Sequence, residues 1–385
     1  MTNEMLHSNA TNPLAGAPTR LLVAMEMSLN TWRLVMAPEG GTRKRVKTVG
    51  AGNYLAVEQA VGEAKARFQL PAETPVVFCY EAGRDGFYPY RRLTAAGHEV
   101  WVIDSASIEV SRRRKQAKSD GIDGDKLAEL MQRQARGEPK ALRIVRVPPP
   151  EVEDQRLLPR EREILLQDVG WLRNQIEAIL FAHGYREVPN TARALQTWVE
   201  ARPDLPPHLR ERLGREIERL ALLETQCRTV EKALAQPVRE ARGAGTVAVV
   251  WSLMQLCGIG LIGAWVLASE IFGWRQFRNR REVGAVLGLT PTPYSSGQSQ
   301  REQGISKAGN RRARAMLVEL AWLWLRYQPD SALAQWFQAR FGGGGKRLRR
   351  IGIVALARRL AIALWRYTAH GIVPDGARLK PVAPV

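Results

Sequence analysis

The chain has 385 residues, of which 57 are Lys or Arg and 38 are Asp or Glu, so its formal net charge is +19. The length suggests two or three domains, and 45% apolar with 25% charged residues excludes wholesale disorder, a collagen and a disulfide-stapled miniprotein. Three Cys without a CxxC pair and only five His disfavour a structural zinc site. The charge surplus predicts a polyanionic partner, most often a nucleic acid.

The first part of the chain predicts a mixed α/β domain over residues 19–146. Residues 1–18 have no apolar secretory segment and are expected to be a disordered leader, with the cytoplasm as the default compartment. Apolar patterns predict strands at Leu21–Met27, Thr31–Met36, Arg43–Val49, Pro75–Tyr80 and Glu99–Ile103, and helices at Tyr54–Phe68, Tyr88–Gly97 and Ile122–Gln134. This order suits a sheet with helices on its faces.

The middle of the chain, residues 147–242, is charged and helical. Two arms with apolar residues spaced by three and four, Arg156–Tyr185 and Pro207–Leu234, flank a Pro-rich turn. The pattern predicts a helical hairpin or coiled-coil arm. Such an arm is either a solvated connector or a dimerising element, and the sequence leaves both open.

The last part, residues 243–385, is predicted to be mainly helical. From Arg275 onward it has 20 Lys or Arg against 5 Asp or Glu, so most of the expected phosphate-binding charge lies here. The uncharged segment Val247–Ala268 has the length of a membrane span. Gln255 and the glycine turn at Cys257–Gly260 interrupt it, which predicts two buried helices and no membrane span. Trp322 and Trp324 are expected to lie in the core.

Four acidic residues of the first domain stand where regular elements end or begin. Glu26 and Glu81 close strands, and Asp120 and Asp123 open a helix. Each one alone reads as a helix cap or a surface charge. Together they predict a site for Mg²⁺ or Mn²⁺, which bind carboxylate oxygens and assist phosphodiester displacement. Spacing alone does not exclude the neighbouring Asp104 and Asp125.

Two basic segments are candidates for nucleic-acid contact, and each has a plain structural alternative. Arg112, Arg113, Arg114, Lys115 and Lys118 form a run that either draws phosphates toward the acids or is a solvated loop. Ser306, Lys307 and Asn310 precede a helix that begins with Arg311, Arg312 and Arg314. Such a helix start binds phosphate or is simply a capped surface helix.

These residues resemble a known family, the DEDD transposases of the IS one-ten type, also called bridge recombinases, and the related pilin-gene invertases. The resemblance lies in the order of an acid in the first strand, Cys79-Tyr80-Glu81-Ala82-Gly83, and the KSDGIDGDKLA run over 118–128. It continues in the glycine turn at Leu256–Gly260, which matches a helix-hairpin-helix-like turn, and in LGLTPTPYSSGQSQREQGISKAGNRRAR over 287–314.

The resemblance implies a RuvC-like, RNase H-type N-terminal domain, a coiled-coil middle and a C-terminal transposase domain with a serine loop. It implies that Glu26, Glu81, Asp120 and Asp123 bind the metal. Glu26 departs from the family, which usually has Asp there. The longer side chain alters the geometry and puts full activity in doubt.

The resemblance also implies that Ser296 is the nucleophile, with Ser295 and Ser299 as its neighbours. From the residues alone, Tyr294-Ser295-Ser296-Gly297 reads as a turn. Attack by a serine Oγ on a phosphodiester conserves the bond energy for religation. The serine and the acids lie in different domains and must meet across domains or subunits.

The function that follows is an insertion-sequence transposase that cuts and rejoins donor and target DNA. The family implies a dimer that assembles into a tetramer, guided by a structured noncoding RNA. Two alternatives remain open: a metal-dependent nuclease or resolvase that uses water, and a nonenzymatic nucleic-acid-binding relative.

Overall fold

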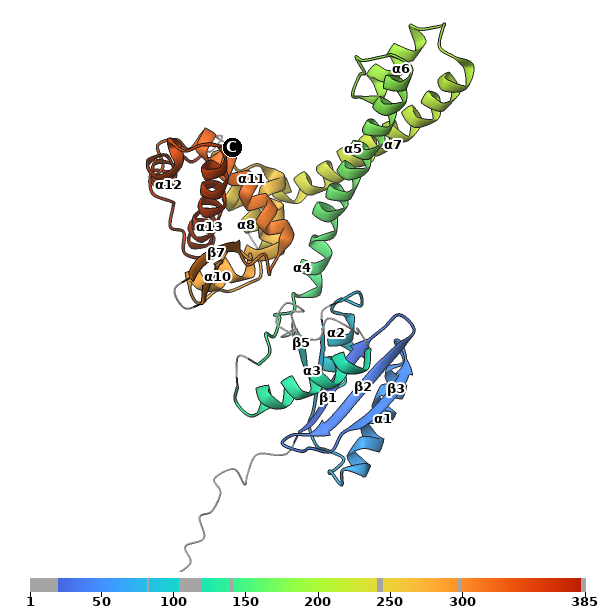
Figure 1. Ribbon diagram of the computed structural model, residues 1–385, viewed down its shortest axis with the longest axis vertical. Helices are drawn as coiled ribbons and strands as arrows, with labels where there is room; N and C mark the ends of the chain where they lie inside the picture. The colour runs from blue at the N-terminus through green and yellow to red at the C-terminus, as the bar shows by residue number, and fades with distance from the viewer. Residues whose placement is uncertain are drawn as a thin grey trace, which may run out of the picture. The chain divides into compact units, whose positions relative to one another are not determined.

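The computed structural model describes residues 20–381, except 82, 104–119, 139–140, 241–244 and 297–298, and it also leaves the side chains of 120–123, 293–296 and 299–303 outside the description. The chain forms two compact units, Met1–Val147 and Pro148–Val385, which are coloured blue to cyan and green to red in Figure 1.

The first unit is built on a five-stranded sheet in the order β3-β2-β1-β4-β5. Its strands are β1 (Leu21–Met27), β2 (Thr31–Pro38), β3 (Arg45–Gly50), β4 (Val76–Glu81) and β5 (Glu99–Ile103). Strand β2 runs antiparallel to both β1 and β3, whereas β4 runs parallel to both β1 and β5. All five predicted strands are therefore confirmed, within two residues at each end.

Helices cover both faces of this sheet, because its central strands are apolar on both sides. In β1, Leu21, Val23 and Met25 face the core under α1 (Tyr54–Arg67) and α2 (Tyr88–Ala95). Leu22 and Ala24 face the opposite core, under α3 (Asp120–Ala135). This alternation with period two is what a strand buried on both faces requires.

The second unit begins with a helical arm. Its helices are α4 (Pro150–Gln155), α5 (Leu157–Ala182), α6 (Ala192–Glu200) and α7 (Pro207–Glu240). Helices α5 and α7 pack along each other through apolar residues spaced by three and four, such as Leu172 and Ile176 of α5 (Figure 1). The predicted pair of arms is confirmed. Helix α6 was not predicted; Thr191 caps it, and it buries only Ala192, Leu195 and Val199.

The remainder of the second unit is mainly helical and shares one apolar core with the arm. Its elements are α8 (Gly245–Met254), α9 (Leu261–Leu267), the π-helical turn η2 (Ala268–Phe272), α10 (Arg280–Val286), β6 (Pro291–Ser296), β7 (Ser299–Ile305), α11 (Arg311–Tyr327), α12 (Ala332–Phe337), the π-helical turn η3 (Gln338–Gly342) and α13 (Lys346–His370). Figure 1 shows these elements in yellow to red.

The long apolar segment forms two helices, as predicted. Helices α8 and α9 are joined by a turn in which Gly258 has a φ of 88°, a conformation that favours glycine. No helix within the described residues combines the length and the apolarity of a membrane span. Trp324 is buried, as expected, but Trp322 is 44% exposed, so the prediction that it lies in the core was wrong.

Candidate functional site

The sheet of the first unit places Glu26 and Glu81 next to each other in register. Strands β1 and β4 are parallel and pair Met25 with Tyr80. Glu26 and Glu81 follow directly, at the carboxyl ends of the two strands. The alternation along each strand puts both residues on the face that α3 covers, because Ala24 and Cys79 already point there.

The first turns of α3 lie against Glu26. A Cβ atom at Gly124 would be 3.1 Å from Glu26 Oε2 and 2.6 Å from Arg33 Nη1. Glycine at this position therefore permits the helix to approach the carboxylate closely. Asp120 and Asp123 belong to the same first turns, and their side chains lie outside the description. The structure thus brings three backbone segments of the predicted acidic quartet to one edge of the sheet.

A guanidinium group accompanies these acids. Arg33 of β2 lies 3.9 Å from Glu26 Oε2 through Nη1 and 3.3 Å from Asp125 Oδ2 through Nη2. Asp125 also lies 3.5 Å from Lys44. Asp125, an alternative metal ligand at the sequence level, is therefore an ion-pair partner of two cations. Asp104, the other alternative, lies outside the described residues.

The carboxylates of the predicted quartet are of the chemical type that binds a hard divalent cation. Carboxylate oxygens are the preferred ligands of Mg²⁺ and Mn²⁺, and Glu26 is only 19% exposed. Among the side chains that the structure describes, no group of three His, Cys, Asp or Glu converges as a metal site needs. The assignment of the quartet as metal ligands stays a prediction.

In the second unit, Ser296 lies at the tip of a β-hairpin. Strands β6 and β7 pair antiparallel, and Ser296 pairs with Ser299 at the end of β6. Gly297 and Gln298 follow in the sequence and lie outside the described residues. The sequence suggested a loop here, but the backbone up to Ser296 is a strand.

The base of this hairpin is tied to the start of α11. Ser306 donates its backbone N–H to Thr290 O at 2.8 Å, and the two hydroxyl oxygens are 3.2 Å apart. Arg314 donates from Nη1 to Leu287 O and to Lys307 O, each at 3.0 Å. Ser306 and Arg314, which were predicted as phosphate contacts, thus hold the base of the hairpin on the helical core.

Asn310 connects the hairpin region to a buried carboxylate. Its side-chain oxygen caps α11 by accepting from Ala313 N at 2.9 Å, and its Nδ2 donates to Glu270 Oε2 at 2.8 Å. Arg160 of the arm donates to both oxygens of Glu270, at 2.8 and 3.1 Å. Arg156 approaches to 4.0 Å. The Glu270 network therefore links the arm, the π-helical turn and α11.

Burial and ion pairing act in opposite directions on Glu270. Its side chain is only 4% exposed, and burial alone would raise the pKa of the carboxyl. The hydrogen bonds and positive charge of Arg160, helped by Asn310 and Arg156, outweigh burial and lower the pKa. Glu270 is thus a carboxylate fixed in its charged form.

The remaining residues predicted to contact nucleic acid differ in whether they are already engaged in ion pairs. Arg312 pairs with Glu163 of the arm at 2.6 Å. Arg311 is exposed at the start of α11, and Lys307, with a φ of 56°, lines a basic hollow that is described below. The run Arg112, Arg113, Arg114, Lys115 and Lys118 lies outside the described residues.

Comparison with known proteins identifies the family. A family model described as "Transposase IS116/IS110/IS902 family" matches residues 252–335. The putative transposase y4rJ of Sinorhizobium fredii is 40% identical over 96% of this chain and 99% of its own length. The transposase for insertion sequence element IS1328 of Yersinia enterocolitica is 27% identical over 92% of this chain and 99% of its own length.

The chain belongs to the IS116/IS110/IS902 family of transposases. The resemblance in the sequence is thereby confirmed, and as a transposase the protein acts on DNA. The matched region contains Glu270, the Ser296 hairpin and the capped start of α11. The matched region therefore contains Glu270 and Asn310 of the network, whereas Arg156 and Arg160 lie outside it.

Sequence reasoning missed Glu270. Its only signal was an acid at the end of a long uncharged segment, where an unpaired charge would be costly. Its partners Arg160 and Asn310 are 110 and 40 residues away in the chain, so no local pattern reports the network.

Proposed function

We propose that this insertion-sequence transposase cuts and rejoins DNA through Ser296. In the proposed step, Ser296 Oγ attacks a phosphodiester, a phosphorus–oxygen bond to the serine forms, and the bond to the leaving deoxyribose oxygen breaks. The Ser296 hydroxyl loses its proton in this step, and the leaving oxygen takes up one proton and departs as a hydroxyl, so the step balances. Attack by a hydroxyl of another strand reverses the step and rejoins the DNA, so bond energy is conserved.

One observation supports this proposal most strongly: the matched region, residues 252–335, contains the hairpin whose tip is Ser296. The tip is followed by Gly297, which adds no side chain beside the attacking group. Arg314 and Ser306 hold the base of the hairpin, so the tip is supported from below.

We further propose a RuvC-like role for the first unit. Its support is the order β3-β2-β1-β4-β5, with two acids at the carboxyl ends of β1 and β4 and two at the start of α3. Glu26, Glu81, Asp120 and Asp123 would hold Mg²⁺ or Mn²⁺. When bound, such an ion supplies charge neutralisation at the reacting phosphate.

The proposed assembly is a dimer that forms a tetramer on DNA and works with a structured noncoding RNA. The net charge of +19 supports a large nucleic-acid partner. Co-expression with the native flanking DNA, purification and sequencing of the bound RNA test the guide. One discrete RNA from the flanks supports it, whereas only heterogeneous RNA that high salt removes contradicts it.

The serine chemistry is tested by trapping a covalent adduct. Labelled DNA with the element's ends is incubated with the wild type, Ser296→Ala and Ser299→Ala, and the product is denatured and separated by electrophoresis. We expect an adduct with the wild type and Ser299→Ala, and none with Ser296→Ala. Recombination by Ser296→Ala at the normal rate would refute the serine mechanism.

The same assay separates the alternatives. A water-using nuclease predicts cleavage without any adduct, lost in Asp120→Ala but kept in Ser296→Ala. A nonenzymatic relative is favoured by one observation, the Arg33 guanidinium 3.9 Å from the Glu26 carboxylate, because a fixed cation there competes with a metal. Glu26→Asp tests it: a gain of activity points to a drifted site, and a loss points to one adapted to glutamate.

A further inference from the structure

A large basic hollow lies beside helix α13 in the second unit, and we call it the α13 groove. Its volume is about 1400 Å³, and α10, α12, α13, the base of the β6–β7 hairpin and residues 372–375 line it. That volume exceeds the ~300–1,000 Å³ of typical small-molecule sites. The groove therefore suits a segment of a polymer better than a metabolite.

The groove is strongly cationic. Nine Lys or Arg residues line it, against a single acid, Asp375. Within the part of the chain that the structure describes, none of these nine cations forms an ion pair. Nine like charges around one hollow repel each other, which costs stability unless a polyanion binds there.

Along α13 the charges alternate with apolar residues in a row that winds around the helix, because each step of four residues turns by about 40°. Arg350, Val354, Arg358, Ile362 and Arg366 follow each other at a spacing of four, and all five line the groove. With a rise of ~1.5 Å per residue, the three Arg are about 12 Å apart along the helix. The result is a row of cations with apolar surface between them.

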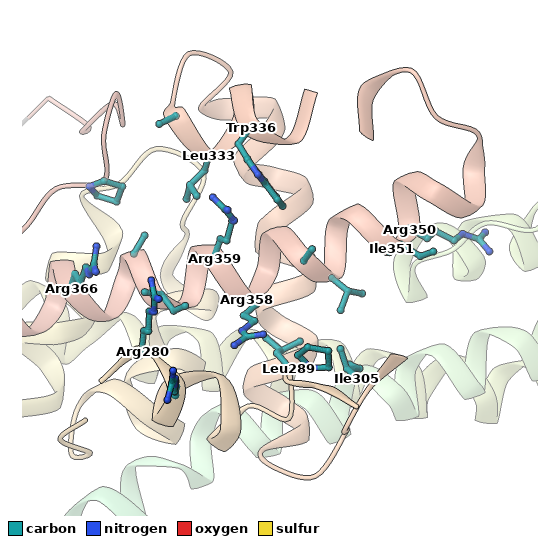
Figure 2. A pocket seen from close by; sticks show the side chains of 18 of the residues that line it. Arg280, Leu289, Ile305, Leu333, Trp336, Arg350, Ile351, Arg358, Arg359 and Arg366 are labelled. Atoms are coloured by element: carbon teal, nitrogen blue, oxygen red, sulfur yellow. The ribbon is translucent and has the colours of Figure 1, made fainter. Parts of the chain in front are cut away.

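The sides of the groove add flat and apolar surface. In Figure 2, Leu333 and Trp336 lie on one side of α13, and Leu289 and Ile305 on the other. The Arg359 guanidinium lies over the Trp336 ring, 4.0 Å from its centroid. Such a stacked pair of planes is a surface on which a further flat ring can stack.

One Arg is held in place by the neighbouring helix. A Cβ atom at Gly284 of α10 would lie 3.2 Å from Arg358 Nε, so the absence of a side chain there gives the guanidinium its position across α10. Helix α10 also contributes Arg280 and Arg281 at its start. These cations thus come from two packed helices, α10 and α13.

We propose that the α13 groove binds an unpaired strand of nucleic acid. Phosphates lie on the Arg row, and bases contact the apolar residues between the Arg and stack near Trp336. A duplex satisfies this surface less well, because its bases are stacked inside and only phosphates reach the apolar residues. The proposal concerns a surface distinct from Ser296 and does not depend on the serine chemistry.

Binding to the full chain tests the Arg row. Labelled unpaired DNA and RNA of the same sequence, the matching duplex, and anionic lipid vesicles are titrated with the wild type and the triple variant Arg350→Gln/Arg358→Gln/Arg366→Gln. The control is Arg193→Gln/Arg212→Gln/Arg215→Gln, which removes the same charge from exposed positions on α6 and α7.

We expect the groove variant to bind the unpaired strands about 100-fold more weakly at ~0.1 M salt, since each single-strand phosphate contact adds ~0.7 to the salt slope. The slope itself should fall by about 2. The control should stay within about threefold of the wild type, because scattered surface charge adds only weak electrostatics. Stronger loss for RNA or for DNA identifies the natural strand, and either supports the proposal.

A second pair of variants tests the stacking surface. Trp336→Leu should lower the affinity for the unpaired strands at least about fivefold, since base–aromatic stacking adds about one to three kcal/mol per base. The affinity for the duplex should stay unchanged. Trp322→Leu, at an exposed position on α11, is the control. Thermal unfolding of each variant checks that it is folded.

Three results would overturn the proposal. The groove variant and the control variant on α6 and α7 could lose equal affinity for the unpaired strands, which would mean that the net charge alone accounts for binding. The wild type could prefer the duplex over the unpaired strand. The groove variant could lose vesicle binding while it keeps nucleic-acid binding. Because Ser296→Ala protein can be used throughout, failure here leaves the serine proposal untouched, and the reverse also holds.

Discussion

The Glu270 network allows a stability prediction that can be worked from the structure. Glu270→Gln keeps the size of the side chain and removes its charge. The change leaves Arg156, 7% exposed, and Arg160 facing each other across a neutral amide. We expect this variant to be markedly less stable than the wild type.

The magnitude follows from what the two Arg lose. Breaking a buried ion pair by removal of one partner costs about 3–5 kcal/mol. Two facts favour the lower end: Arg160 is 36% exposed and can turn toward water, and the Gln oxygen still accepts one hydrogen bond. A loss of about 3 kcal/mol corresponds to a fall in Tm of about 6–12 °C for a unit of this size.

Thermal unfolding followed by circular dichroism measures this, with Glu163→Gln as the matched control. Glu163 pairs with Arg312 at 2.6 Å, but both side chains are more than 40% exposed. Loss of an exposed pair costs at most about 1 kcal/mol. Equal effects of the two substitutions would refute the reasoning, because burial would then not decide the cost.

The pH dependence provides an independent check. The folded-state pKa of Glu270 lies below its ordinary value of 4.5, so the carboxylate stabilises the fold above that pH. This contribution is lost as the pH falls through the folded-state pKa. The difference in unfolding free energy between wild type and Glu270→Gln should therefore be full near neutral pH and shrink below 4.5. A difference that grows on acidification would contradict the assignment.

Two further predictions concern glycine and cysteine. Gly309 has a φ of 147°, and a Cβ atom there would collide with Val286 O, so Gly309→Ala should lower the free energy of unfolding, measured in urea, by more than ~2 kcal/mol. The control Gly304→Ala has open space around it and should lower that free energy by only ~1 kcal/mol; equal losses would disprove the clash. Burial raises the pKa of the Cys79 thiol, whereas Cys257 is partly exposed. A thiol reagent at mildly alkaline pH should therefore modify Cys257 in the folded chain and leave Cys79 unmodified until the chain unfolds. Rapid labelling of Cys79 in the folded chain would contradict its burial.

Local patterns predicted most of the first unit. The apolar strands β1 and β4 end near their acidic residues, and Gly97 follows α2. Residues adjacent in sequence therefore indicate where these elements end. The proximity of Glu26 and Glu81 could be anticipated from the parallel pairing of β1 and β4. The Arg33 contact could not, because it depends on the register between β1 and β2 and on the absence of a side chain at Gly124.

The second unit was harder to predict because its decisive contacts are distant in sequence. The hairpin strands β6 and β7 contain Pro, Ser, Gly and Gln, which are poor strand formers, so the sequence suggested a loop. Helix α6 is short and buries three residues. The Arg row of α13 is visible at a spacing of four, but only the packing of α10 and α12 makes it one wall of a hollow.

The boundary after Val147 also bears on the order in which the chain folds during synthesis. Every strand pairing of the five-stranded sheet lies within the first 103 residues, so the first unit can close while the arm is still being made. The base of the arm is different, because Arg160 reaches its partner only when residue 270 has left the ribosome. Between those two points of translation the nascent protein has a complete sheet and an arm whose Arg160 has not yet met its carboxylate partner.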